Sequence, residues 1–229
     1  MGGRRICYAG AVRRLAAAFV AGLAALCCAA LPARALDGDA EALIARMTSA
    51  DPGLHTYRAD VAFEVGLHTF PYVRRTLHGN AYFKRPSNLE LIFTDLPPIA
   101  RAYSNLYVGL GSPAEWQRKY AIGSAQEVRD GRAMPYLVLT PLARDRRLRE
   151  VDVFVDQEAS LPARIVWLYR DGRIEMHQRF ARLDGHDVVV AQNADIRLPA
   201  VHAFVNATIT NYALNVDVDD AVFTKKKTS

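Results

Sequence analysis

The fold is decided by the stretch RTLHGNAYFKRPSNLELIF, which runs from Arg75 to Phe93. In its first half the apolar residues Leu77, Ala81 and Phe83 fall on alternate positions, with mostly polar residues between them. In an extended chain, alternate side chains point to opposite faces of the sheet. The first half of the stretch therefore predicts a strand with one buried face and one solvated face.

Pro86 divides the stretch into two strands. Proline has no backbone N–H to donate to a central ladder, so it is expected at a strand end. After it, Leu89, Leu91 and Phe93 begin a second alternating series. We expect Lys84-Arg85-Pro86 to be a solvated corner, and charge reversal of its two basic residues to leave folding nearly unchanged.

The same stretch carries four basic side chains and three aromatic rings, a mixture that also occurs on nucleic-acid-binding surfaces. The charge balance argues against that interpretation. The whole chain has 29 Lys and Arg against 24 Asp and Glu, but residues 1–35 contain five Arg and no acid. Residues 36–229 therefore hold 24 basic and 24 acidic side chains, and we expect no nucleic-acid partner.

Residues 1–35 have the pattern of a secretory signal peptide. Four arginines precede an apolar run from Leu15 to Leu31, and Ala33-Arg34-Ala35 supplies the small residues that signal peptidase requires. We predict cleavage after Ala35 and export to the periplasm. Two alternatives stay open, namely a membrane anchor, because about 20 apolar residues span a bilayer, and lipidation at Cys27 or Cys28.

All three cysteines lie within this predicted signal. After cleavage the chain has no thiol, which excludes disulfides, a cysteine nucleophile and cysteine-ligated zinc. The fold must then depend on its hydrophobic core. Residues 36–229 are long enough to form that core as a single domain.

The mature chain is predicted to contain one helix followed by strands. Apolar residues at helical spacing between Ala40 and Met47 predict the helix, which Asp37 or Asp39 would cap. From Tyr57 onward, apolar and polar residues alternate in almost every segment, as is typical of strands.

The turns predict how these strands pair. Asp-Gly pairs begin at positions 130, 171 and 184, and this pair favours tight hairpins. Consecutive strands should therefore be antiparallel. Residues 96–126 interrupt the pattern, with a short helix expected at Pro113 to Tyr120, because proline suits the first position of a helix.

No motif for catalysis or metal binding is present. The six histidines are scattered, and no pair has the spacing of a helical zinc site. The sequence also lacks a Gly-x-Ser-x-Gly nucleophile elbow and a phosphate-binding glycine loop. We therefore predict no metal, no cofactor and no enzymatic activity.

A long meander with so little helix can bury its apolar faces in three ways. It can close into a barrel, pack on itself as a sandwich, or curl around an apolar cavity. The third arrangement would suit an acyl chain. The residue pattern by itself leaves these three alternatives open.

The order of the motifs resembles the periplasmic lipoprotein carriers of the LolA type and their relatives. A helix after the signal is followed by YRADVAFEVGL, by GNAYFKRPSNLELIF, and by a second half that runs from Tyr136 to Phe180. Residues 96–126 depart from the pattern of that family. The resemblance implies a mainly β fold with a few helices, in which a strongly curved antiparallel sheet forms a half-barrel capped by helices. It also implies an apolar cavity that holds acyl chains without covalent chemistry.

From this resemblance we expect a soluble periplasmic carrier that shuttles a lipoprotein or lipid toward the outer membrane. It would work as a monomer between inner-membrane donor and outer-membrane acceptor proteins. The alternative is a lipid-sensing or structural module on the same fold, with no transport role. The candidates for lipid contact, each of which could instead be plain core, are Phe63, Val65, Leu91, Phe93, Val153, Val155, Trp167, Tyr169 and Met176.

Overall fold

The computed structural model describes residues 38–70, 72–86, 88–94, 110, 112–129, 131–143 and 147–224. The chain divides into the units Met1–Ala35 and Leu36–Ser229, and every described residue belongs to the second unit. The predicted signal peptide with its cysteines, Asp130, and the lysines at 225–227 lie outside the described residues. Cleavage after Ala35 stays a prediction.

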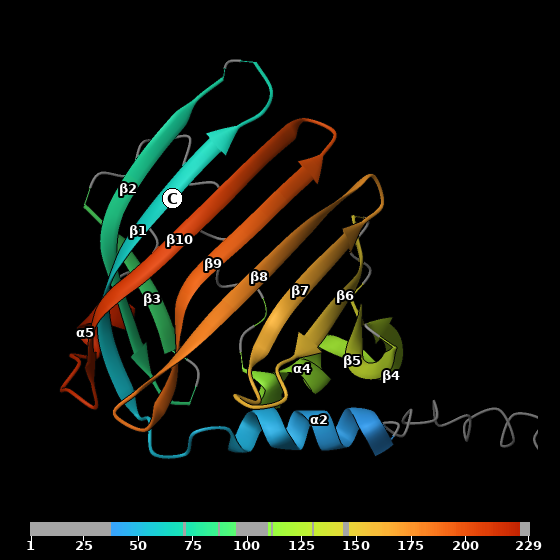
Figure 1. Ribbon diagram of the computed structural model, residues 1–229, viewed down its shortest axis with the longest axis horizontal. Helices are drawn as coiled ribbons and strands as arrows, with labels where there is room; N and C mark the ends of the chain where they lie inside the picture. Colours follow the sequence, from blue (N-terminus) through green and yellow to red (C-terminus); the bar gives the residue numbers. More distant parts are fainter. Residues whose placement is uncertain are drawn as a thin grey trace, which may run out of the picture. The chain divides into compact units, whose positions relative to one another are not determined.

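Ten strands form one antiparallel sheet in the order β3-β2-β1-β10-β9-β8-β7-β6-β5-β4 (Figure 1). β3 and β4 are its two margins and do not pair with each other, so the sheet is open. The strands are β1 (Thr56–Leu67), β2 (Arg74–Lys84), β3 (Asn88–Phe93), β4 (Tyr120–Arg129), β5 (Arg132–Pro141), β6 (Leu148–Val155), β7 (Pro162–Tyr169), β8 (Gly172–Leu183), β9 (His186–Leu198) and β10 (Val201–Leu214). The expected antiparallel half-barrel is confirmed.

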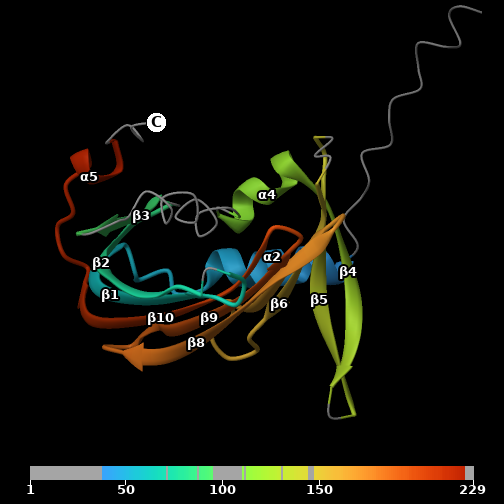
Figure 2. The ribbon, with the colours of Figure 1, turned by 90° about the horizontal axis from the view of Figure 1, so that it is seen from above.

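Three helices accompany the sheet, namely α2 (Gly38–Ser49), α4 (Pro113–Lys119) and α5 (Ala221–Thr224). Figure 2 shows the sheet curving around α2 and α4. The predicted apolar stripe of α2 is confirmed, because Ala40, Leu43, Ile44 and Met47 are all buried. Full burial of each larger side chain contributes about 2 kcal/mol, so packing rather than helix propensity holds α2 in place.

α4 is fixed by a single buried ring. Pro113 occupies its first turn, as expected. Trp116 is only 1% exposed, and its indole Nε1 donates to the carbonyl of Leu110 at 2.7 Å. The tryptophan therefore joins α4 both to the core and to the residues that precede the helix.

The decisive stretch forms β2, the corner at Pro86 and β3, as expected. The close approach of β3 requires a glycine at position 79, because a Cβ there would lie 2.3 Å from the carbonyl oxygen of Ile92 on β3. Any larger residue would push β3 away from β2. Similarly, Asp184 and Gly185 have φ angles of 50° and 85°, which confirms the expected hairpin turn between β8 and β9.

The prediction that Lys84 and Arg85 form a merely solvated corner is wrong. Lys84 Nζ lies 2.5 Å from the carboxylate of Asp220, in the segment that leads into α5. The Arg85 guanidinium is partly buried and donates to the backbone carbonyls of Ala50, Asp51 and Leu54. These three carbonyls follow α2 and have no other donor from a helix or strand ladder, so Arg85 ties the α2–β1 connection to the sheet.

The interruption predicted for residues 96–126 is too long at its C-terminal end. β4 already begins at Tyr120 and pairs with β5 from Tyr120 to Arg129. Gly123 and Ala125 weaken the alternation there, because small residues carry little apolar signal. Pairing with β5 supplies the stability that the local sequence lacks.

Candidate binding surface on the concave face

The strand register places all nine candidate residues on one face of the sheet. Directly paired residues of an antiparallel sheet point to the same side. Phe63 pairs with Ala207 and Leu77, and the same row-by-row pairing continues across the sheet as far as Leu137 and Leu139 on β5. This is the face that α2 and α4 contact, and we call it the concave face.

Four of the nine candidates belong to the core beneath the helices. Val153 and Val155 are 0% and 4% exposed and pack in one cluster with the apolar stripe of α2 and with Trp116. Trp167 and Met176 are partly buried against the same cluster. The two valines are thus structural core, whereas Trp167 and Met176 retain accessible surface that a ligand could contact.

The other candidates lie away from these helices. Phe63 is buried in a second cluster, and Val65, Leu91 and Phe93 pack against it while remaining partly exposed. Tyr169 is partly buried against a third cluster formed by Ile174, Ile196 and Ala203.

The helices leave this second half of the concave face open. In the described part of the chain, the substantial helix–strand contacts are those of α2 and α4 with β4 and β5, and those of α5 with β3. The half built by β1, β2 and β10 therefore carries apolar side chains that no described helix covers to a comparable extent.

One polar residue of the concave face was missed by the sequence analysis. Gln192 is 6% exposed, and its Oε1 accepts no hydrogen bond from the described residues. The register places it between Ala207 on β10 and Gln178 on β8. The available signal was a glutamine within the alternating apolar series that includes Val188, Ala194 and Ile196.

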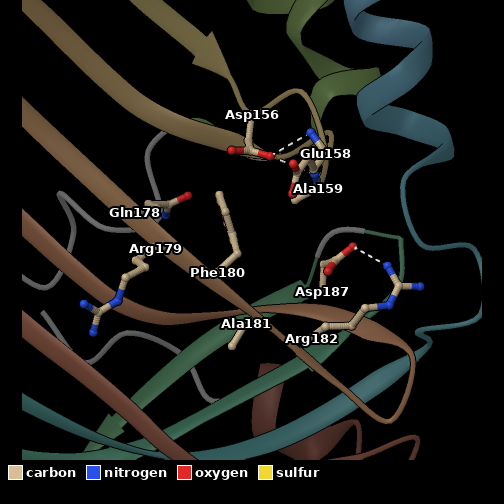
Figure 3. A pocket seen from close by; sticks show the side chains of 9 residues that line it. All are labelled: Asp156, Glu158, Ala159, Gln178, Arg179, Phe180, Ala181, Arg182 and Asp187. Carbon is tan, nitrogen blue, oxygen red and sulfur yellow. Dashed lines mark hydrogen bonds and ion pairs between the residues drawn. The ribbon is translucent and has the colours of Figure 1, made fainter.

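A cavity of about 430 Å³ adjoins this point, between β8 and the connection from β6 to β7 (Figure 3). Gln178 and Phe180 point to one side of β8, and Arg179 and Ala181 to the other (Figure 3). None of the nine predicted residues lines this cavity. It is largely polar at its rim, so it differs in character from the open apolar half.

The charged groups of this cavity are mostly engaged. The Asp156 carboxylate accepts from the backbone N–H groups of Glu158 and Ala159 at 2.9 and 2.8 Å. Arg182 Nη1 lies 3.3 Å from the Asp187 carboxylate. These interactions stabilise the two turns.

Two tyrosines of the open half stay protonated at neutral pH. Burial raises the pKa of Tyr57 to about 12. The pKa of Tyr212 is raised as well, mainly by burial and to a smaller extent by the nearby Tyr57. The Tyr212 hydroxyl donates to the carbonyl of Val189 at 2.5 Å. Their rings meet edge to face at 5.3 Å, so both contribute as apolar surface rather than as proton donors to chemistry.

On the opposite, convex face, the carboxyl group of Asp152 has a raised pKa. Burial, and then the negative charge of Glu150, raises the pKa of Asp152 to about 6. Nearby, the Arg164 guanidinium stacks over the Phe154 ring at 3.9 Å. Asp152 Oδ1 is buried and has no hydrogen-bond partner among the described residues.

Further features bear on metal and membrane chemistry. Among the described residues, no group of three or more His, Cys, Asp or Glu side chains gathers in a way that could hold a metal ion. No helix in the described ranges has both the length and the apolar character needed to cross a membrane.

Solved structures share this fold. A DUF1329 family protein from Desulfovibrio piger superposes with a TM-score of 0.59 at 14% identity, covering 82% of this chain and 98% of that chain. A LolA superfamily protein from Nitrosomonas europaea gives a TM-score of 0.50 at 13% identity, covering 81% and 97%. A domain described as an outer membrane lipoprotein-sorting protein, from Vibrio parahaemolyticus, gives 0.55 at 11% identity, covering 82% and 95%.

No family model and no curated protein sequence matches the chain. The similarity to the solved structures covers most of the second unit, and at this level of identity it establishes the fold. The expected LolA-like fold is therefore confirmed.

Proposed function

We propose that this protein, which has the LolA-like fold, is a soluble periplasmic carrier of acyl chains. Its cargo would be a lipoprotein or lipid that it carries toward the outer membrane, without covalent chemistry. The observation that supports this most directly is the half of the concave face on β1, β2 and β10, where apolar side chains remain partly exposed. Two of the similar solved structures carry lipoprotein-sorting or LolA names, which agrees with the proposal.

The driving force for binding would be the removal of the acyl chain from water. Each buried methylene contributes about 0.8 kcal/mol, so a chain of typical length supplies ample affinity. Val65, Leu91 and Phe93 would contact the chain on the open half, and Trp167, Tyr169 and Met176 would continue the apolar surface across the sheet. Val153, Val155 and Phe63 would act beneath them as support.

Gln192 would give the cargo one polar contact. Its unpaired Oε1 is a buried acceptor on the strand between Ala207 and Gln178, and leaving a buried acceptor unpaired costs about 1–3 kcal/mol. A hydroxyl or amide N–H near the head of an acylated cargo could supply the missing donor. A carrier must also release its cargo, and a face with a single polar contact favours exchange over permanent retention.

The test is transfer of a fluorescent acyl lipid from donor to acceptor vesicles by the purified protein. We expect transfer to rise with protein concentration and to stop when Val65 is replaced by Asp. Binding of the probe without transfer would instead identify a lipid-sensing or structural module on the same fold. Absence of both binding and transfer would reject the proposal.

A further inference from the structure

The meander places four of its connections at one end of the sheet. β1, β5, β7 and β9 run toward this end and β2, β6, β8 and β10 run away from it, because all neighbouring strands are antiparallel. Backbone hydrogen bonds link adjacent connections, from Arg170 N to Arg147 O at 2.8 Å and from His68 N to His202 O at 2.7 Å. We call the described residues of 68–75, 142–149, 169–173 and 197–202 the arginine rim.

The arginine rim has a strong excess of positive charge. It contains seven arginines and one acid, Asp171, and the arginines are Arg74, Arg75, Arg147, Arg149, Arg170, Arg173 and Arg197. The opposite end of the sheet, formed by the described residues of 51–56, 84–86, 131–132, 156–161, 182–187 and 215–220, has eight acids against four basic side chains. Residues 36–229 are neutral in total, but basic side chains predominate at one end of the sheet and acidic side chains at the other.

Part of the positive charge is available for a partner. Arg74, Arg173 and Arg197 form ion pairs with acids on the convex face. By contrast, Arg75, Arg149 and Arg170 are exposed and have no acidic partner among the described residues.

Large apolar side chains project from the same end. Phe70 and Tyr72, at the tip of the β1–β2 connection, are 88% and 78% exposed, and Leu142, after β5, is 58% exposed. Isolated exposed apolar residues are common on proteins. Two strongly exposed aromatic side chains close together in the sequence, followed by Arg74 and Arg75, form the kind of exposed apolar feature that marks an interaction surface.

The β1–β2 connection is fixed at its base by contacts with its own strands and with β10. Leu67 N donates to Val73 O at 2.8 Å and closes the connection at its base. The His68 ring lies 4.9 Å from the His202 ring of the neighbouring connection, and Arg74 lies over the Phe204 ring at 5.8 Å. The base of the β1–β2 connection, from which Phe70 and Tyr72 project, is thus packed against β10.

We propose that the arginine rim docks on the surface of an anionic phospholipid bilayer, with Phe70 and Tyr72 in the headgroup layer and the unpaired arginines on lipid phosphates. Aromatic rings with a polar edge favour the membrane interface, and arginines near it gain from the negative surface potential. A nucleic acid fits less well, because ring stacking with bases requires a groove or platform and these rings lie at a projecting tip. The proposal is independent of whether the concave face carries acyl chains.

The test is flotation of the exported protein with vesicles of phosphatidylcholine alone or mixed with phosphatidylglycerol. We expect binding only to the anionic vesicles, and loss of binding at 1 M salt, where the Debye length falls to about 3 Å. Arg75→Glu and Arg149→Glu should each weaken binding at least about fivefold. Phe70→Ser combined with Tyr72→Ser should weaken it about tenfold.

Matched controls come from the opposite end. Val128 is 73% exposed on β4, and Arg132 is exposed at the start of β5. Val128→Ser and Arg132→Glu should leave vesicle binding unchanged. All variants share the wild-type sequence of residues 1–35 and are exported in the same way, so any contribution of that segment to lipid binding is equal in all of them.

Three outcomes would overturn the proposal. The first is that the protein binds neutral and anionic vesicles equally well. The second is that the rim variants and the control variants lose vesicle binding to the same extent. The third is that the protein binds a DNA duplex but floats with neither kind of vesicle. Phe70 and Tyr72 lie at the tip of the β1–β2 connection, outside the strands of the concave face, so binding of a fluorescent acyl probe should be unaffected in their double variant. Arg75 pairs directly with Val65, so its variant is left out of this comparison. The two proposals can therefore fail separately.

Discussion

The side-chain Nε of Arg85 donates to the backbone carbonyl of Leu54, 2.5 Å away, and the same guanidinium reaches the carbonyls of Ala50 and Asp51. One arginine at the end of β2 thus holds the connection between α2 and β1. Because this connection positions α2 over the concave face, its loss should loosen the core beneath the helix as well.

Charge reversal at the corner should distinguish its two basic residues. Arg85→Glu would remove the guanidinium donor from the carbonyls of Ala50, Asp51 and Leu54, of which Asp51 still accepts from Leu54 N at 3.2 Å, and would bring a carboxylate against them. We therefore expect a loss of about 2–4 kcal/mol in the free energy of unfolding. Lys84→Glu breaks a pair whose Asp220 side chain is 77% exposed, so its cost should be much smaller than that of Arg85→Glu. Urea unfolding of both variants measures the difference. Equal effects would show that the contacts of Arg85 contribute no more than a surface ion pair.

Acyl binding should depend on which face of the sheet is altered. Val65→Asp places a charge on the open half of the concave face and should weaken binding of a fluorescent fatty acid at least about tenfold. Thr208→Asp is the matched control, because Thr208 is exposed on the convex face of β10 next to Ala62. Titration of the probe compares them, and equal weakening would place the ligand elsewhere.

Replacement of Gln192 by Met should stabilise the ligand-free protein by about 1 kcal/mol, because it removes an unpaired acceptor while nearly preserving volume. The half-buried Gln178 gives the control, since Gln178→Met should change stability much less. Chemical unfolding without ligand measures both variants. A loss of stability in Gln192→Met would mean that the glutamine makes a stabilising hydrogen bond in solution.

The stability of the fold should depend on pH through Asp152. Its pKa is raised to about 6 in the folded protein, so the folded state binds this proton more tightly than the unfolded state does. The associated stability is fully present below about pH 4, the ordinary carboxyl range, and is lost as the pH rises through about 6. Asp152→Asn should remove this loss and raise stability at pH 8 by about 1 kcal/mol, allowing for solvent screening.

Unfolding curves of the wild type and of Asp152→Asn at pH 4 and pH 8 test this directly. Glu158→Gln, an exposed carboxyl in the β6–β7 connection, serves as a control for general loss of negative charge. An advantage of Asp152→Asn that is the same at both pH values would contradict the assigned titration.

Local sequence predicted much of this fold. The apolar alternation in Arg75 to Phe93 and the spacing within α2 identified β2, β3 and the first helix, because those signals depend on neighbours along the chain. The start of β4 was predicted too far along the chain, because Gly123 and Ala125 weaken its apolar alternation and its stability comes from pairing with β5. The contacts of Arg85 were also missed, because its carbonyl partners lie over 30 residues away.

For the candidate site, all nine residues chosen from the sequence lie on one face of the sheet, and their role in lipid contact stays a prediction. The alternation of apolar residues groups each strand's candidates on one side. Which of them are buried, like Val153, or partly exposed, like Val65, depends on where α2 and α4 pack, and the alternation does not show this. Gln192 was not predicted as a site residue, because a single glutamine in an apolar series forms no recognisable motif. Summed charge predicted no nucleic-acid partner. It could not show that Arg75, Arg149 and Arg170 lie at one end of the sheet, because that placement depends on the strand order.

The central claim is that the concave face carries acyl chains, and native mass spectrometry of the protein purified from its own periplasm tests it most directly. We predict that acylated molecules co-purify with the wild type and are absent from Val65→Asp but present in Thr208→Asp. A wild-type protein that is free of ligand, and that also fails to bind a fluorescent fatty acid, would contradict the account.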